Sequence, residues 1–153
     1  MYLYRIADRR YGPESGEGAR LYGGRWNSPG RAVIYACTSL TGAMLEKLVH
    51  TGRQIPRHQV CVTFEAPARI APTVLDEVAH PGWEAPDQIA SRAAGDAWLA
   101  ARRSAILLVP SVVFAIERNS LLNPAHPDAH DIRITSIEPV RWDERLFDLP
   151  RRQ

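Results

Sequence analysis

Several short stretches of the chain alternate between apolar and polar positions, a pattern that is typical of β-strands with one buried face. In one of them, Val60, Val62 and Phe64 alternate with polar residues. The stretches that predict strands are residues 1–7, 31–37, 58–65, 105–109, 112–116 and 132–140. Pro110 lies between the fourth and the fifth, so these two form either a strand pair or one strand bent at the proline.

Two other stretches have the periodicity of helices. Thr38 or Ser39 can cap a helix that continues to about His50, because either hydroxyl can accept a hydrogen bond from a first-turn amide. Residues 89–103 place Trp98 and several alanines on one face, which predicts a second helix. The segments without such periodicity are residues 8–30, 69–87 and 119–131. Irregular segments as long as the first are usually functional or disordered.

The predicted elements indicate a fold class. Strands outnumber helices and no strand–helix–strand repeat occurs, so we predict an α+β fold rather than a doubly wound sheet. A length of 153 residues suits one ordinary domain, and we therefore predict that residues 1–153 form a single domain. No charged-then-apolar leader opens the sequence, and no apolar run approaches the length that spans a bilayer. We expect a cytoplasmic protein without membrane contact.

Composition adds little to this picture. The net charge of +2 is small, and the arginines are scattered among the acidic residues, so we expect no direct nucleic-acid binding. Lys47 is the only lysine, so the remaining eighteen of the 19 basic residues are arginines. GC-rich codon usage explains this bias, although arginine also suits anion recognition. Cys37 and Cys61 lie in apolar stretches and are expected to be buried thiols rather than a disulfide.

The segment Gly23-Gly24-Arg25-Trp26-Asn27 is a candidate ligand site. A glycine pair lets the backbone approach a ligand closely, and Arg25 offers a planar fork of donors for phosphate or carboxylate. The segment lacks both the Gly-Lys-Ser/Thr ending of a Walker loop and the dinucleotide fingerprint that opens a helix. A plain turn explains the glycine pair alone, whereas its combination with Arg25 indicates anion binding.

Glu46 is a second candidate, because it lies in the middle of the first predicted helix among small and apolar neighbours. If half-buried, its carboxylate could stabilise a developing cation or accept a proton; an ordinary surface glutamate is the alternative. Tyr35 and Trp26 could stack on a flat ring or pack in the core. Ser111, which follows Pro110, is either a ligand hydroxyl or a turn residue.

A metal site is not predicted. His126, Asp128 and His130 are close in sequence, but the spacing around Pro127 fits no zinc pattern. No serine or cysteine lies in a recognisable nucleophile motif either.

Taken together and in order, these motifs resemble the RES family, toxins of bacterial toxin–antitoxin pairs that are named for an Arg-Glu-Ser trio. The matching stretches are Tyr4-Arg5, residues 24–30, residues 33–35, Glu46 with its helix, Pro110-Ser111 and residues 119–126. The trio maps onto Arg25, Glu46 and Ser111. Residues 66–103 carry no family motif, so nothing is transferred to them.

The resemblance implies a fold similar to ADP-ribosyltransferases of the diphtheria-toxin kind, with mixed or antiparallel sheets. It also implies an enzyme that breaks the nicotinamide–ribose bond of NAD+, its co-substrate, without a metal. In the catalytic trio Glu46 would stabilise the oxocarbenium-like ribose, and Arg25 would hold the diphosphate. Ser111 would bond to ribose or amide.

The remaining implied NAD+-binding residues surround this trio. Tyr35 or Trp26 would stack on the nicotinamide or shape its pocket. Asn27 is expected to bind NAD+ with Arg25. Asn119 would pin the loop behind the site.

Three functions remain open. The ADP-ribose is transferred to a protein, such as an enzyme of nucleotide precursor synthesis, or NAD+ is hydrolysed or phosphorolysed and thereby depleted. In the third, the chain is a non-catalytic anion-binding domain in which Arg25 and Glu46 form an internal ion pair. Transfer is slightly favoured because residues 8–20 could form a rim that faces an acceptor, or equally a lid. The implied partner is an antitoxin of the Xre, helix-turn-helix type.

Overall fold

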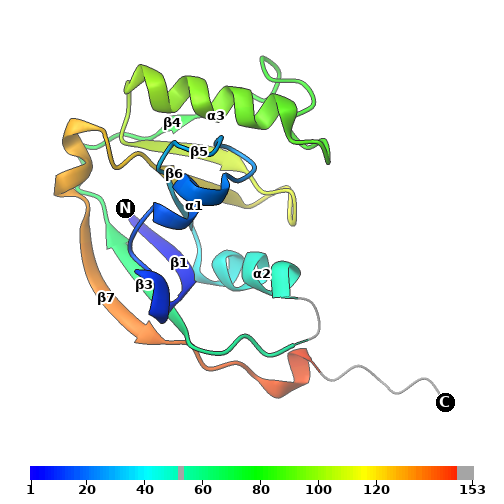
Figure 1. Ribbon diagram of the computed structural model, residues 1–153. Coiled ribbons are helices and arrows are strands. Elements are labelled where there is room, and N and C mark those ends of the chain that lie inside the picture. The colour runs from blue at the N-terminus through cyan, green and yellow to red at the C-terminus, as the bar shows by residue number, and fades with distance from the viewer. Residues whose placement is uncertain (52–53, 148–153) are drawn as a thin grey trace.

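Within residues 1–51 and 54–147, which the computed structural model describes, seven strands form one sheet (Figure 1). The strand order is β4-β5-β6-β2-β1-β3-β7, and only β4 and β5 are parallel. The strands are β1 (Tyr2–Asp8), β2 (Ile34–Cys37), β3 (Gln59–Glu65), β4 (Thr73–Val74), β5 (Ile106–Pro110), β6 (Arg118–Leu122) and β7 (Arg133–Pro139). The helices are α1 (Glu17–Tyr22), α2 (Leu40–Thr51) and α3 (Ile89–Ala101), with short 3-10 turns η1 (Arg9–Tyr11), η2 (Pro127–Asp131) and η3 (Glu144–Leu146). The predicted α+β class and mixed sheet are confirmed.

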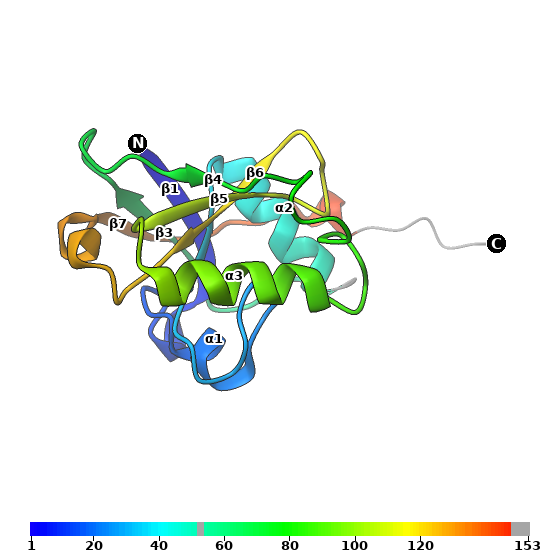
Figure 2. The same ribbon diagram turned by 90° about the horizontal axis from the view of Figure 1, so that it is seen from above.

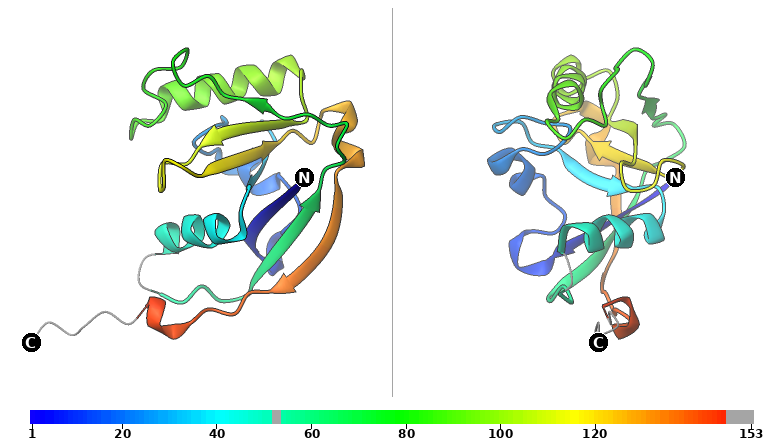
Figure 3. Two further views of the ribbon diagram at one scale, coloured as in Figure 1. Left: turned by 180° about the vertical axis from the view of Figure 1, so that it is seen from behind. Right: turned by 90° about the vertical axis from the view of Figure 1, so that its right-hand side faces the viewer.

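The sheet has two halves with a narrow junction between them. β1 pairs with β2 at one register position, Tyr4 opposite Cys37, whereas the β1–β3 and β2–β6 ladders are continuous. Figure 1 shows α2 beside this junction, and Figure 3 shows β7 along the outer edge of the β1–β3–β7 half. In Figure 2, α3 extends alongside the other half, with α1 next to it. The junction therefore brings α2 close to strands from both halves.

Both faces of the central strands are buried. On β5, Ile106 packs into one hydrophobic cluster with Leu3 and Phe64, while its neighbour Leu107 packs into a second cluster. On β6, the neighbours Leu122 and Leu121 divide in the same way. Successive side chains of a strand point to opposite faces, so one strand pair contributes to two cores. The second core lies under α3, which contributes Ala94, Trp98 and Leu99.

Helix α2 begins where the sequence predicts. Of its two candidate caps, Ser39 is the one that accepts a hydrogen bond from the Gly42 amide, at 3.0 Å. Thr38 instead donates to the Arg118 carbonyl. Only Ala43 is fully buried on this helix, which leaves α2 at the margin of the core. In the described part of the chain, no helix combines the length and apolarity that crossing a membrane requires.

Two predictions about the second half of the chain are wrong. Residues 112–116 are not a strand, because the Ser111 hydroxyl accepts from the amides of Val113 and Phe114 and turns the chain. Residues 119–131 are not irregular throughout, since β6 occupies 118–122. This strand is buried on both faces and therefore shows no alternation.

Two other predictions need correction in detail. Residues 8–30 contain η1 and α1, which are too short to show helical periodicity, and residues 69–87 contain β4. The cysteines are both free thiols, as expected, but only Cys37 is buried. Cys61 is half-buried because it faces a groove lined by Leu40 and Met44 of α2.

Helix α3 approaches the loop that follows α1 so closely that only glycine fits between them. A β-carbon added to Gly95 would lie 1.8 Å from the carbonyl oxygen of Trp26. The Trp26 side chain stacks on Trp83, with ring centroids 6.3 Å apart. Gly95 therefore determines how closely α3 packs against residues 23–27.

We predict that Gly95→Ala lowers the free energy of unfolding by about 3 kcal/mol, because helix and loop must move apart to admit the methyl group. Urea-induced unfolding measures the change. Gly18→Ala in α1 is the matched control: no atom lies within 4 Å of its added β-carbon, so it should leave stability unchanged or raise it by about 0.5 kcal/mol. Equal stability of the two variants would contradict the close approach.

Candidate functional site

Glu46 accepts two hydrogen bonds on a single carboxylate oxygen. The Ser111 hydroxyl and the Asn119 side-chain amide each donate to Oε1 at 2.7 Å. These donors are 65 and 73 residues away in sequence, one directly after β5 and the other on β6. Glu46 is half-buried, and within the described residues no hydrogen bond reaches its Oε2. The carboxylate is thus held through one oxygen, while the other can accept from a ligand.

The Ser111 hydroxyl has no hydrogen-bonding capacity left for a ligand. It donates to Glu46 and accepts from the amides of Val113 and Phe114, both at 3.1 Å. A hydroxyl has one proton and two lone pairs, so all three positions are used. Ser111 is also only 3% exposed. The structure therefore makes Ser111 a support for Glu46, rather than the ligand hydroxyl that the resemblance implied.

Asn119 has a structural role, as the sequence predicts, and the group that it fixes is Glu46. Its Oδ1 accepts from the Cys37 thiol at 3.1 Å, which turns the amide NH2 group toward Glu46. Burial raises the pKa of Cys37 to about 12, and the negative charges of Glu46 and Glu117 contribute to the same shift. The thiol therefore remains protonated and a donor at neutral pH.

The β5–β6 loop, residues 111–117, is fastened to α2 at both of its ends. Ser111 bonds to Glu46 in the middle of the helix, and Ser39 at the start of the helix donates to Glu117 Oε2 at 3.0 Å. The same Ser39 hydroxyl caps α2 through Gly42. Helix and loop thus form one rigid frame around the carboxylate.

Arg25 is held by neutral oxygen atoms. Its Nη1 donates to the backbone carbonyls of Trp83 and Ala85, each at 3.1 Å. Among the described residues no salt bridge joins Arg25 to Glu46 or to another carboxylate. Carbonyl groups orient a guanidinium without neutralising it, so Arg25 keeps its charge for an anion. The internal ion pair with Glu46, on which the non-catalytic alternative relied, is absent from this part of the chain.

The turn before Arg25 requires glycine at both positions. Gly23 has a φ of 71°, and a β-carbon on Gly24 would lie 2.6 Å from the Tyr35 hydroxyl. That hydroxyl accepts from the Trp26 amide at 2.9 Å and donates to Asn27 Oδ1 at 2.8 Å. Burial raises the pKa of Tyr35 to about 12, so the hydroxyl keeps the proton that it donates. Tyr35 thereby fixes the backbone that carries Arg25.

Asn27, for which the sequence predicts a contact with NAD+, has a structural role in this loop. Its side chain is fully buried, and its amide nitrogen donates to the carbonyls of Ala19, Ser28 and Arg31. Together with the bond from Tyr35, these contacts hold the loop from inside. Such an arrangement leaves no surface of Asn27 for a ligand.

Trp26 belongs to the core. Its side chain is 2% exposed and stacks on Trp83, which favours core packing, one of the two predicted alternatives, over stacking on a ligand. Tyr35 is half-buried, so its ring remains the accessible aromatic surface of the predicted pair.

Two residues of α3 that the sequence analysis missed also hold this loop. Asp96 accepts from the amide of Ser28 at 2.9 Å and from its hydroxyl. Arg92 Nε donates to the Gly24 carbonyl at 3.4 Å. The sequence offered one signal for them: a cation and an acid four residues apart, on a helix otherwise rich in alanine.

The histidine-rich segment lies apart from this frame and has a local role. His126 accepts from the Asp128 amide and caps η2. In residues 1–51 and 54–147, no three His, Cys, Asp or Glu side chains gather in a way that could hold a metal ion.

We predict that Tyr35→Phe lowers the free energy of unfolding by about 2 kcal/mol, because the buried Trp26 amide and Asn27 Oδ1 both lose their partner. Chemical denaturation monitored by tryptophan fluorescence measures the effect. Tyr22→Phe, at a side chain that is 84% exposed, serves as the control and should change stability by less than about 0.5 kcal/mol. A Tyr35→Phe protein as stable as this control would show that the hydroxyl does not hold the loop.

Comparison with known proteins places this frame in a family. The chain is 40% identical over 140 residues to a Prs ADP-ribosylating toxin of Sphingobium sp. (strain YBL2), covering 87% of this chain and 86% of the relative. It is 36% identical over 150 residues to Toxin Res of Pseudomonas putida (strain KT2440), covering 96% and 100%. The crystal structure of the M. tuberculosis MbcT–MbcA toxin–antitoxin complex has the same fold, with a TM-score of 0.73 at 20% identity over 95% of this chain and 86% of that one. The RES domain model matches residues 2–143, and the chain belongs to the RES domain family.

Proposed function

We propose that this protein is the toxin of a toxin–antitoxin pair, and that it cleaves the nicotinamide–ribose bond of NAD+ and transfers ADP-ribose to a cellular protein. The observation that carries the proposal is the Glu46 carboxylate, fixed through Oε1 and open at Oε2. Relatives named as an ADP-ribosylating toxin and as Toxin Res support it.

The reaction needs a fixed negative charge more than a strong acid. When the bond between ribose C1 and the nicotinamide nitrogen breaks, its electron pair neutralises the pyridinium, so nicotinamide leaves without receiving a proton. Positive charge develops on the ribose, and Glu46 stabilises it while Oε2 accepts from a ribose hydroxyl. A nucleophile of the acceptor then bonds to C1 and loses its proton. Ser111 and Asn119 keep Glu46 in place throughout.

Arg25 supplies the complementary charge for the substrate. NAD+ carries a diphosphate, and a guanidinium can bind phosphate oxygens through two parallel hydrogen bonds. The carbonyls of Trp83 and Ala85 occupy one nitrogen of Arg25 and set its direction. Tyr35, half-buried beside the same turn, shapes the nicotinamide pocket in this proposal.

The expected partner is an Xre-type antitoxin that covers this site in the cytoplasm. The similarity in fold to the toxin of the MbcT–MbcA complex supports an antitoxin partner. NAD+ is a co-substrate in this proposal, and no step involves a metal.

Transfer and depletion of NAD+ differ in where the ADP-ribose goes. Cell lysate is incubated with the purified protein and NAD+ labelled in its adenylate part, and proteins are then separated by electrophoresis. Transfer predicts label on a discrete protein band. Nicotinamide release without a labelled band would instead identify a hydrolase or phosphorylase that depletes NAD+.

We predict that Glu46→Gln lowers kcat for nicotinamide release by at least about a hundredfold, because the charge is lost while the shape is kept. Chromatography of nicotinamide measures the rate, and circular dichroism verifies the fold. Glu138→Gln, an exposed glutamate on β7, is the matched control and should retain full activity. Wild-type turnover by a folded Glu46→Gln protein would exclude this role for Glu46.

We also predict that Arg25→Lys raises KM for NAD+ about tenfold, since lysine keeps the charge but cannot form two parallel hydrogen bonds to phosphate. Steady-state kinetics separate KM from kcat. An unchanged KM would contradict binding of the diphosphate by Arg25.

A further inference from the structure

Arg25 and Arg92 are held differently from the arginines that form salt bridges. Six arginines of the described residues form salt bridges with aspartate or glutamate; these are Arg10, Arg20, Arg31, Arg69, Arg118 and Arg145. In the same part of the chain, no salt bridge is formed by Arg25 or Arg92, and both bind only neutral oxygen atoms. Two uncompensated positive charges therefore lie at one turn.

The hydrogen bonds of these two arginines join the same two regions of the chain, the glycine turn (residues 23–27) and residues 83–92. Arg25 reaches from the glycine turn to the carbonyls of Trp83 and Ala85, ahead of α3. Arg92 reaches back from the first turn of α3 to the carbonyl of Gly24, the residue before Arg25. Both arginines thus take part in the contact between the glycine turn and the segment that leads into α3.

The groups described next to Arg92 do not neutralise its positive charge, so this charge can attract a bound anion. Its Nη2 donates to the neutral side chain of Gln88 at 3.2 Å. The acid one turn further along α3, Asp96, already binds Ser28 and forms a salt bridge with Arg31. Burial raises the pKa of Tyr35, while the positive charges of Arg92 and Arg25 act to lower it and the negative charge of Asp96 acts to raise it.

We propose that Arg92 is a second diphosphate-binding residue, which together with Arg25 binds the two phosphates of NAD+. The inference rests on the proposed function and adds a residue of α3, in residues 66–103, where the sequence motifs predicted no site residue. A diphosphate carries two negative charges on adjacent phosphate groups, and two guanidinium groups that bind neutral acceptors at the same turn complement it in charge. Arg92 is half-buried, so its interaction with phosphate is screened less by salt than that of an exposed arginine.

The test compares two substrates that contain the same scissile bond. NAD+ carries the diphosphate, whereas nicotinamide riboside has no phosphate. We expect Arg92→Gln to lower kcat/KM for NAD+ at least about tenfold, mainly through KM, because a charged hydrogen bond to phosphate is lost. For nicotinamide riboside, the change should be less than about twofold. Arg92→Lys keeps the positive charge. Its kcat/KM should lie between those of the wild type and Arg92→Gln for NAD+, but not for nicotinamide riboside.

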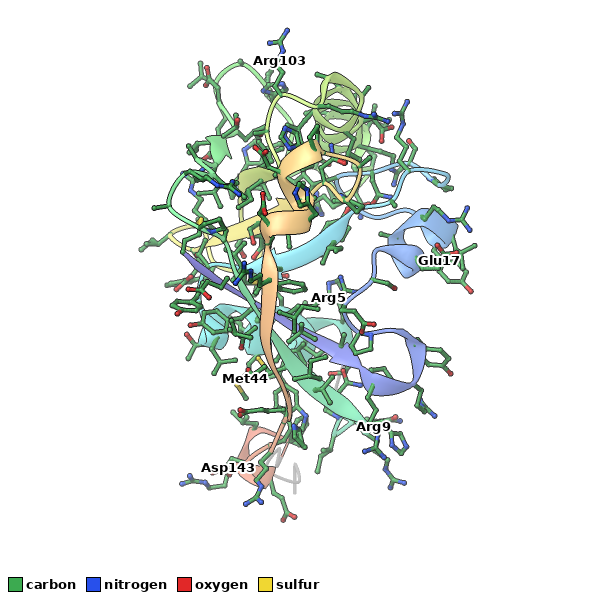
Figure 4. The ribbon with its side chains drawn as sticks, turned by 90° about the vertical axis from the view of Figure 1, so that its left-hand side faces the viewer. Arg5, Arg9, Glu17, Met44, Arg103 and Asp143 are labelled. Atoms are coloured by element: carbon green, nitrogen blue, oxygen red, sulfur yellow. The ribbon has the colours of Figure 1, made fainter. Side chains whose placement is uncertain are left out.

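Arg103→Gln is the matched control, because Arg103 lies just beyond the same helix and its side chain points away from the protein (Figure 4). It should leave the kinetics for both substrates unchanged. Equal losses of Arg92→Gln on both substrates would show that Arg92 only supports the Gly24 turn, and no loss on either would show no role; both results overturn the proposal.

A direct binding measurement distinguishes failure of this assignment of Arg92 from failure of the proposed reaction. Binding of ADP-ribose can be measured by calorimetry without turnover. Arg92→Gln should weaken this binding at least about tenfold, whereas the control Arg103→Gln should leave it unchanged. If the wild type binds ADP-ribose in this manner but releases no nicotinamide from NAD+, the proposed reaction fails while the assignment of Arg92 stands. If the wild type turns over NAD+ and Arg92→Gln binds ADP-ribose normally, the assignment of Arg92 alone fails.

Discussion

The arrangement of the site depends on one half-buried carboxylate and its two donors. A charged group away from water is costly unless hydrogen bonds compensate it, and Glu46 receives that compensation from Ser111 and Asn119. Both donors reach Oε1 only if helix α2 is correctly positioned relative to the end of β5 and to strand β6. Helix α2 follows β2, which pairs directly with β6, and this pairing brings Glu46 to the strands that carry both donors. The position of Glu46 thus constrains much of the surrounding fold.

A second group of polar contacts is organised around the glycine turn. Tyr35 and Asn27 hold this turn from inside, and both are occupied with backbone and with each other. From outside, α3 packs against it through Gly95 and binds it through Arg92 and Asp96. Most polar residues near the turn therefore have a structural role, because their hydrogen bonds hold the turn in place. Arg25 stands out because its acceptors are neutral, so its charge is oriented but not cancelled.

The sequence predicts those parts of the structure that depend on local pattern. Strands β1 and β3 and helices α2 and α3 follow from periodicity, and Arg25 and Glu46 attract attention because they interrupt an apolar or glycine-rich context. Strand β6 escapes detection because both of its faces are buried, and residues 112–116 imitate a strand because they are apolar yet lie in a loop. The support of Glu46 by Ser111 and Asn119 joins residues more than sixty positions apart, which no local pattern encodes. The sequence also does not reveal that the polar atoms of Asn27 are engaged by the loop itself, because its acceptors lie on residues 19, 28 and 31.

The most direct measurement is a crystal structure of the protein with a non-cleavable NAD+ analogue, in which carbon replaces the ring oxygen of the nicotinamide ribose. We expect Glu46 to keep both donors on Oε1, and Oε2 to lie about 2.6–3.0 Å from a hydroxyl of that ring. We also expect the diphosphate to bind the guanidinium of Arg25. A complex in which the ring lies away from Glu46, or in which Ser111 leaves Glu46 to bind the ligand, would contradict the role proposed for Glu46.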